Sequence, residues 1–414
     1  MDLSIYSVWG AGVAFLVAWL TAHALTRVFG APPSDGRFAT IDGLRGFLAF
    51  SVFMHHNVIW FVYLRTGQWV APQSALFRHF GESAVALFFM ITAFLFTTKV
   101  LNSRERPIDW TRLYVGRLTR LFPMYAVAVT VVWVMAWLLT GHARNVGWGT
   151  LLDEFVHWLA FTIRDHPDVN GLAGTSILIA GVTWSLPYEW WFYLSLPFLA
   201  LVLRRRPPAT WLLLGAVTVL LVTDWWQLDP ARLLPFVGGV LAAWLVRDER
   251  FRALAAHRLS GLVVVAALVG TVLLTPSAFT PLAVALLTVA FAFVSAGTDV
   301  FGILTSPTSR LLGEVTYSMY LIHGLILTTV FRFIVGTDVA ATWSPLHHWV
   351  VILGLAVVLV LLSYAAFRLV EVPGQRLTPV LLKGVERVRR LLERPGAPSS
   401  PGTPVPVSQD EAHR

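Results

Sequence analysis

The residues of this sequence best suited to chemistry are an arginine and a histidine within one apolar segment. Arg45, in the run at residues 41–46, stands eleven residues before His56. On a helix this spacing is three turns plus about 20°, with a rise of about 16 Å, so both side chains lie on one face at different depths. The permanent charge of Arg45 suits an anionic ligand such as a phosphate, and His56 can take a proton from a hydroxyl. His55 points about 100° away, which is typical of a helix–helix contact.

A single carboxylate marks a second apolar segment. Glu189 lies among aromatic residues in the run from Thr183 to Tyr193. A carboxylate in an apolar environment needs a partner. Three functions of Glu189 remain open: it orients His56, it binds the hydroxyl of an acceptor molecule, or it pairs with an arginine. The aromatic residues around it are also typical of a belt at the membrane interface.

Two further groups of polar residues occur near apolar segments. Tyr317, Tyr320 and His323 recur at i, i+3 and i+6, which predicts one helical face; a fixed structural network is the alternative to a catalytic function. Arg117 and Arg120 share a face just before a proline. Facing Arg45, this pair would form a phosphate clamp, although arginines at such a border also serve as plain membrane anchors.

The elements that position these side chains are predicted to be membrane helices. The chain has 414 residues, of which 56% are hydrophobic and 13% charged, and its mean hydropathy is +0.68. A soluble domain carries about 25% charged residues, so the composition excludes an ordinary soluble enzyme. Apolar runs near the roughly 20 residues needed to cross a bilayer recur along the chain, which predicts an all-α, polytopic membrane bundle.

Windows of about 19 residues predict about eleven spans. One longer segment between spans, residues 142–183, is interpreted as a lid, an acceptor-binding loop or a plain connection on the outer side. The predicted spans are residues 7–26, 43–64, 82–100, 121–140, 184–203, 209–224, 232–246, 259–275, 279–296, 313–335 and 347–370.

The distribution of arginines predicts the orientation of the chain. Most arginines fall in alternate loops, which the positive-inside rule assigns to the cytoplasm, so we expect the N-terminus outside and the C-terminus inside. The net charge of +8 is therefore mostly topological and does not indicate nucleic-acid binding. The first apolar run could also be a signal peptide, but Arg27 follows the run and no basic residue precedes it, which favours a retained span. The loops expected outside hold only Arg65, Arg78, Arg144, Arg164, Arg232 and Arg332.

Several kinds of chemistry are excluded or not indicated. The sequence has no cysteine, which excludes thiolate nucleophiles, disulfides and cysteine-bound metals. Its remaining histidines lack a compact metal-ligand spacing, so we expect no metal site. The sequence contains no nucleophile elbow, Walker loop or dinucleotide fingerprint.

Taken together, these motifs resemble the membrane acyltransferase-3 family of O-acyltransferases. The resemblance covers about residues 40–376 in the family's order. It rests on Ile41–Gly46 with His56 as an Arg-x10-His signature, on Leu87–Leu95, on Arg117–Pro123 as an Arg-x-x-Arg element, on the string from Trp184 through Glu189 to Pro197, on Leu312–His323, and on Glu371–Pro373.

The sequence departs from the family pattern in a few places. It has Thr92-Ala93 where the family usually has Ser-Gly, and Ala86 where a polar residue is common. Pro187 is unusual within its block and could bend that helix. The family core has about ten spans, so we expect an added helix and inner loop in residues 1–39, the acyltransferase domain in residues 40–376, and a basic and then Pro- and Ser-rich cytoplasmic tail in residues 377–414.

The resemblance implies an enzyme of a bacterial plasma membrane that uses cytoplasmic acyl-CoA, with acetyl-CoA expected, and no metal. Its acceptor would be a hydroxyl of a carbohydrate, a glycolipid of the cell envelope or a related small molecule. His56 would be the general base, Glu189 would hold the tautomer of His56 or the acceptor, and His323 would polarise the thioester carbonyl or relay a proton. The residues expected to bind donor or acceptor are Arg45, Arg117, Arg120, Tyr317, Tyr320, Trp184 and Ser185.

Two kinds of alternative remain open from the sequence. Lys99 and Lys383 are the only lysines, and this preference for arginine indicates a GC-rich genome, which keeps a macrolide or another secondary metabolite as an alternative acceptor. A proton-coupled transporter or flippase would use a buried histidine and carboxylate without making a covalent bond. A structural scaffold would tolerate the loss of His56.

Overall fold

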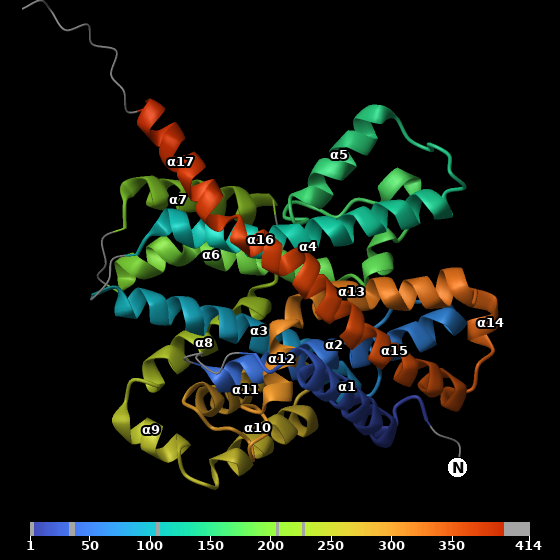
Figure 1. Ribbon diagram of the computed structural model, residues 1–414, viewed down its shortest axis with the longest axis horizontal. Coiled ribbons are helices and arrows are strands. Elements are labelled where there is room, and N and C mark those ends of the chain that lie inside the picture. Colours follow the sequence, from blue (N-terminus) through green and yellow to red (C-terminus); the bar gives the residue numbers. More distant parts are fainter. Residues whose placement is uncertain (1–3, 33–37, 105–107, 204–206, 226–227, 393–414) are drawn as a thin grey trace, which may run out of the picture.

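The computed structural model describes residues 4–32, 38–104, 108–203, 207–225 and 228–392, and within these ranges the chain forms helices and turns with no strand (Figure 1). This confirms the predicted all-α membrane fold. The Pro- and Ser-rich part of the predicted tail lies outside the described residues. The α-helices are α1 Val8–Phe29, α2 Ala39–Thr66, α3 Ala75–Leu101, α4 Trp110–Leu139, α5 Trp148–Leu159, α6 Ser185–Val202, α7 Ala209–Trp225, α8 Leu234–Leu245, α9 Glu249–Ala255, α10 Ser260–Leu274, α11 Pro281–Ser295, α12 Pro307–Glu314, α13 Thr316–Thr328, α14 Thr337–Ala341, α15 Pro345–Ala366, α16 Val372–Arg376 and α17 Thr378–Leu392.

Each predicted span coincides with a helix, but the helices differ in length. Among the described residues, six helices are long and apolar enough to cross a membrane, or seven if the pair bent by 103° around residues 246–248 forms one span. Helices α10 and α11 have 15 residues each. Such a helix is about 22 Å long, shorter than the roughly 30 Å hydrocarbon core. The protein is therefore a multi-pass membrane protein, and the count of eleven crossings and their direction stay predictions.

Glycines let α2 and α12 cross at backbone contact. A Cβ added at Gly46 would lie 2.6 Å from the carbonyl carbon of Leu312 in α12, and one added at Gly313 would lie 1.8 Å from the Asp42 carbonyl oxygen. A Cβ added at Gly43 would lie 1.9 Å from the carbonyl oxygen of Leu304, just before α12. No side chain fits in these places, because the atom it would meet belongs to the backbone. The glycines that flank Arg45 are therefore required by packing, and they fix the depth of Arg45 beside α12.

Replacing Gly313 with alanine is expected to destabilise the protein. The added methyl group would force α12 away from Asp42, and overpacking of this kind typically costs about 1–3 kcal/mol. We expect the midpoint of thermal unfolding in detergent to fall by several degrees. The matched control is Gly354→Ala in α15, where an added Cβ meets nothing within 4 Å. Equal midpoints for the two variants would show that the crossing is not tightly packed.

Two departures from the family pattern are accommodated by the fold. Helix α8 packs on α3 through Gly239, at which an added Cβ would lie 2.7 Å from the Ala93 Cβ, so these helices pack closely with alanine at this position. Pro187 falls in the first turn of α6, where a missing N–H leaves no hydrogen bond unmade. Pro187 is therefore not expected to bend α6.

Part of the predicted outer segment is buried in the bundle. Residues 142–183 contain α5 and three short 3-10 turns, of which Thr175–Ile179 packs on α13. Leu178 and Ile179 are buried, and an alanine at Gly324 would place its Cβ 2.5 Å from the Ile179 carbonyl carbon. The segment is therefore more than a plain connection, because its end reaches the interior beside His323.

Glu371 fixes the start of α13. Its carboxylate is buried and accepts hydrogen bonds from the Ser318 amide, at 2.9 Å, and from the Ser318 hydroxyl. The first amides of a helix have no partner within the helix, and a carboxylate there also complements the helix dipole. The motif Glu371–Pro373 thus holds α13, the helix that carries His323, in place.

Candidate active site

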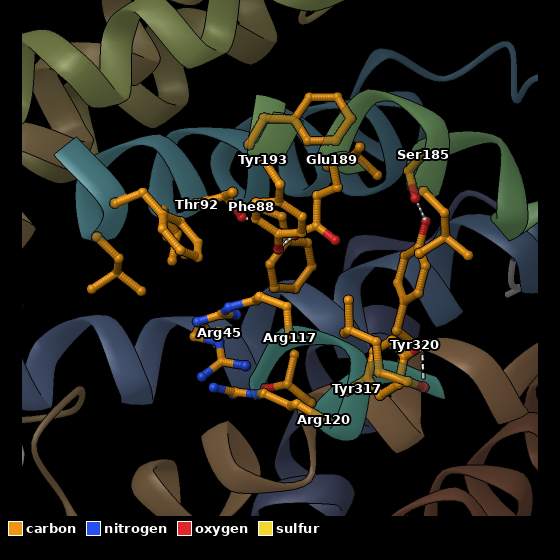
Figure 2. Close-up of a pocket in the computed structure, with 18 residues that line it drawn as sticks. Arg45, Phe88, Thr92, Arg117, Arg120, Ser185, Glu189, Tyr193, Tyr317 and Tyr320 are labelled. Carbon is orange, nitrogen blue, oxygen red and sulfur yellow. Dashed lines mark hydrogen bonds between the residues drawn. The ribbon is translucent and has the colours of Figure 1, made fainter. Parts of the chain in front are cut away.

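Three arginines from two helices point into one cavity. Arg45 of α2 and Arg117 and Arg120 of α4 line a narrow cavity of about 110 Å³, called the arginine cavity below (Figure 2). The Arg45 guanidinium lies 3.8 Å from the Asp42 carboxylate, and that of Arg117 lies 4.6 Å from the centre of the Phe96 ring. The structure thus brings together the three residues that sequence reasoning grouped as an anion clamp.

Glu189 lies on the opposite wall of the arginine cavity (Figure 2). One of its carboxylate oxygens accepts hydrogen bonds from the Thr92 hydroxyl, at 2.9 Å, and from the Tyr193 hydroxyl, at 3.0 Å. Within the described parts of the chain, Glu189 makes no hydrogen bond to His56 and no ion pair with an arginine. The carboxylate is therefore held by hydroxyls and faces the space that the arginines also face.

The tyrosines predicted at the site are held through their hydroxyls. Tyr320 donates to the Val182 carbonyl at 3.0 Å and lies 2.9 Å from the Ser185 hydroxyl, while Tyr317 donates to the Leu121 carbonyl at 3.0 Å. All three side chains line the arginine cavity. The tyrosine hydroxyls are thus occupied by main-chain carbonyls, which favours a structural function over proton transfer.

The two predicted histidines touch each other. The Nδ1 atom of His56 lies 3.1 Å from Nε2 of His323 and 3.0 Å from the Val52 carbonyl. Nδ1 of His323 lies 3.2 Å from the Met319 carbonyl. A carbonyl only accepts, so in the neutral pair we assign both protons to Nδ1. His56 then donates to both the Val52 carbonyl and the lone pair on Nε2 of His323.

With this assignment, the lone pair of the His56 ring is on Nε2, the nitrogen that can accept a proton. The ring of His56 stacks on Trp69, with centroids 6.2 Å apart and planes 20° apart. His56 also lines a second cavity of about 610 Å³, called the histidine cavity below, together with Trp184, Glu82 and Arg232. A hydroxyl bound in this cavity would be beside a histidine whose tautomer is already set.

The two cavities follow one another along α3. Gly81 and Glu82 line the histidine cavity, and the residues of α3 that line the arginine cavity lie between Val85 and Phe96. Aromatic rings lie between them, and we call this group the aromatic partition. In it the Phe88 and Tyr320 rings are 6.2 Å apart, as are the Tyr320 and His323 rings and the Phe89 and Trp184 rings.

The structure divides the predicted site residues between these places. Arg45, Arg117, Arg120, Ser185, Glu189, Tyr317 and Tyr320 line the arginine cavity, His56 and Trp184 line the histidine cavity, and the fully buried His323 lines neither and contacts His56. His55 makes the helix–helix contact that its direction predicts. Its Nδ1 donates to the Phe77 carbonyl at 2.8 Å.

Sequence reasoning missed three neighbours of the site. Tyr193 stands four residues after Glu189, a spacing that places both on one helical face and could have revealed their hydrogen bond. Thr92 had been noted only as a departure from the family pattern, and nothing in the sequence singles out Trp69. Among the residues that the structure describes, no group of three or more His, Asp or Glu side chains could hold a metal ion.

The chain matches a known protein family over most of its length. A family model described as an acyltransferase domain matches residues 38–365, beginning after α1. The chain is 25% identical over 381 residues to "Acyltransferase MdmB" of Streptomyces mycarofaciens, covering 84% of this chain and 94% of that protein. It is 29% identical over 194 residues to "Nodulation protein 10" of Rhizobium leguminosarum bv. viciae, covering 45% of this chain and 49% of that one. No solved structure matches.

Proposed function

The chain belongs to the acyltransferase-3 family and is an acyltransferase, and from this premise we propose that it transfers an acetyl group from acetyl-CoA to the hydroxyl of an acceptor. The acceptor is a carbohydrate, a glycolipid or a related small molecule, including a secondary metabolite. The protein works in a bacterial plasma membrane, with its N-terminus outside and its C-terminus in the cytoplasm. The donor enters from the cytoplasm.

The arginine cavity receives the donor. Arg45, Arg117 and Arg120 bind the diphosphate of acetyl-CoA, because guanidinium groups make charge-assisted hydrogen bonds to phosphate oxygens. The extended pantetheine arm then reaches toward His56, about 16 Å along α2 from Arg45. Glu189 lines this path, so we assign it to the donor arm, whose amide N–H groups are donors for its carboxylate.

The reaction occurs at the histidine pair. Nε2 of His56 takes the proton of the acceptor hydroxyl while the hydroxyl oxygen attacks the thioester carbonyl carbon. The C–S bond then breaks, the ester forms, and the CoA sulfur leaves with the proton carried by His56. His323 accepts a hydrogen bond from Nδ1–H of His56 throughout, which holds the tautomer and supports the imidazolium.

One observation supports this proposal more than any other. His56 lies beside a large cavity, its Nδ1 is occupied by His323 at 3.1 Å, and the arginine cavity lies across the aromatic partition from the histidine cavity. A general base between one site suited to an anionic donor and another open to a second molecule fits the transfer of a group between two substrates.

The purified protein in detergent is expected to bind acetyl-CoA and to hydrolyse it slowly without an acceptor, because water can replace the acceptor hydroxyl. Release of the CoA thiol can be followed with a thiol reagent, since the chain has no cysteine of its own to react. Acyl-CoA chains of two to eight carbons would compare donors. A well-folded protein without affinity for any acyl-CoA would contradict the proposal and favour a transporter.

A further inference from the structure

A cleft rich in basic side chains lies beside the arginine cavity. It has a volume of about 710 Å³ and is called the basic cleft below. Leu95, Phe96, Arg117 and Arg120 line both spaces, so the narrow arginine cavity adjoins the wider cleft. The charged residues that line the basic cleft are Lys99 of α3, Arg112, Arg117 and Arg120 of α4, and Lys383 and Glu386 of α17.

The charges of the basic cleft are unbalanced. Five basic side chains line it against one carboxylate, that of Glu386, which pairs with Arg390 at 3.7 Å. In the described stretches of the chain, no carboxylate lies within ion-pair distance of any of the five. Repulsion between neighbouring cations is reduced when an anion binds among them, so the cleft fits a ligand with several negative charges.

Helix α17 is held in place at this cleft. Its first residue, Thr378, has its hydroxyl 2.7 Å from the Thr119 hydroxyl of α4. In the preceding helix, an added Cβ at Gly374 would lie 2.5 Å from the Pro123 ring, so α16 also packs tightly on α4. These contacts hold the start of α17 against α4, and Figure 1 shows α17 continuing beyond α16. Lys383 therefore reaches the cleft from a segment that follows the family match, which ends at residue 365.

We propose that the basic cleft binds the 3′-phosphate of the donor's nucleotide through Lys99, Arg112 and Lys383. The inference rests on the proposed function, in which the diphosphate lies on Arg45, Arg117 and Arg120. The adenosine of acetyl-CoA lies beyond the diphosphate, on the side away from the thioester, and the cleft adjoins the arginine cavity on the side away from His56. Anionic lipid headgroups offer the same phosphate chemistry, but, unlike the 3′-phosphate of the donor, they are not part of a molecule that also occupies the arginine cavity.

The test compares acetyl-CoA with acetyl-dephospho-CoA, which lacks only the 3′-phosphate. Wild type is expected to have a KM about 10- to 100-fold lower for acetyl-CoA, since hydrogen bonds to charged groups contribute about 1.5–3 kcal/mol. The double variant Arg112→Gln/Lys383→Gln is expected to lose most of this ratio by raising the KM for acetyl-CoA alone. The matched control is Arg387→Gln, an exposed α17 residue that does not line the cleft. It should keep the ratio.

Three outcomes would overturn the assignment. The first is equal use of both thioesters by wild type, and the second is an equal rise of both KM values in the double variant. The third is a rise of KM in the double variant that occurs in nanodiscs containing phosphatidylglycerol but not in nanodiscs of phosphatidylcholine alone. That result would identify lipid headgroups as the ligand of the cleft.

Failure of wild type to use either thioester would count against the proposed function and not against the cleft. Calorimetric titration with adenosine 3′,5′-bisphosphate tests the cleft separately. Binding by wild type that weakens at least tenfold in the double variant supports the assignment, and unchanged binding overturns it.

Discussion

Replacing His56 with glutamine is expected to lower the turnover of acetyl-CoA by about 10²–10⁴-fold, the usual contribution of a general base. Glutamine has a similar reach but cannot take a proton from the acceptor hydroxyl. Affinity for acetyl-CoA should stay within about twofold of wild type, because His56 does not line the arginine cavity. Initial rates of thiol release and equilibrium binding of acetyl-CoA, measured on the same preparation, would show this separation.

The control for this experiment is His347→Gln. His347 is exposed at the start of α15 and lines neither cavity, so its replacement should leave both quantities unchanged. If the His56 variant kept near-normal turnover while remaining folded, then the base would have to be another group.

Arg45→Ala is expected to raise the KM for acetyl-CoA by about 10- to 100-fold and to change kcat much less. The lost interaction is a hydrogen bond between a guanidinium and a phosphate, and such bonds contribute about 1.5–3 kcal/mol. The effect is expected mainly in KM because Arg45 lies about 16 Å along α2 from His56. Steady-state kinetics over a wide range of acetyl-CoA concentrations would measure it.

Two variants make this prediction specific. Arg45→Lys keeps the charge but loses the two-pronged geometry, so its KM should lie between those of wild type and the alanine variant. Arg250→Ala removes an exposed arginine at the start of α9 and should leave the kinetics unchanged. A large fall in kcat with an unchanged KM for Arg45→Ala would contradict donor binding and indicate a function near the reacting atoms.

What the sequence could predict of this site depends on whether one helix or two is involved. The shared face of Arg45 and His56 follows from helical periodicity within α2. The contact between His56 and His323 joins residues 267 positions apart, and no spacing rule yields it. The sequence therefore identified both histidines and left two functions open for His323, polarising the thioester carbonyl or relaying a proton, but it gave no sign that Nε2 of His323 lies against Nδ1 of His56.

The fold, too, could be predicted from the sequence only where local patterns determine it. Long helices with an apolar core, such as α1 and α2, were predicted to within a few residues at each end. Helix α4 starts at Trp110, eleven residues before its predicted span, because hydropathy does not detect the amphipathic turns that carry Arg112 and Arg117. The burial of residues 175–182 was also not predicted, since it depends on Gly324, whose missing side chain makes room for a segment far away in the sequence.

The aromatic partition also affects the permeability of the membrane to protons. Two water-accessible cavities that met inside the bundle would form a leak through which protons could run down their gradient. In this structure the rings of Phe88, Phe89, Trp184 and Tyr320 lie between the two cavities. A thin pantetheine arm that passes these rings would itself fill the opening it makes. An acyltransferase built in this way can pass an acyl group from one cavity to the other without becoming a pore.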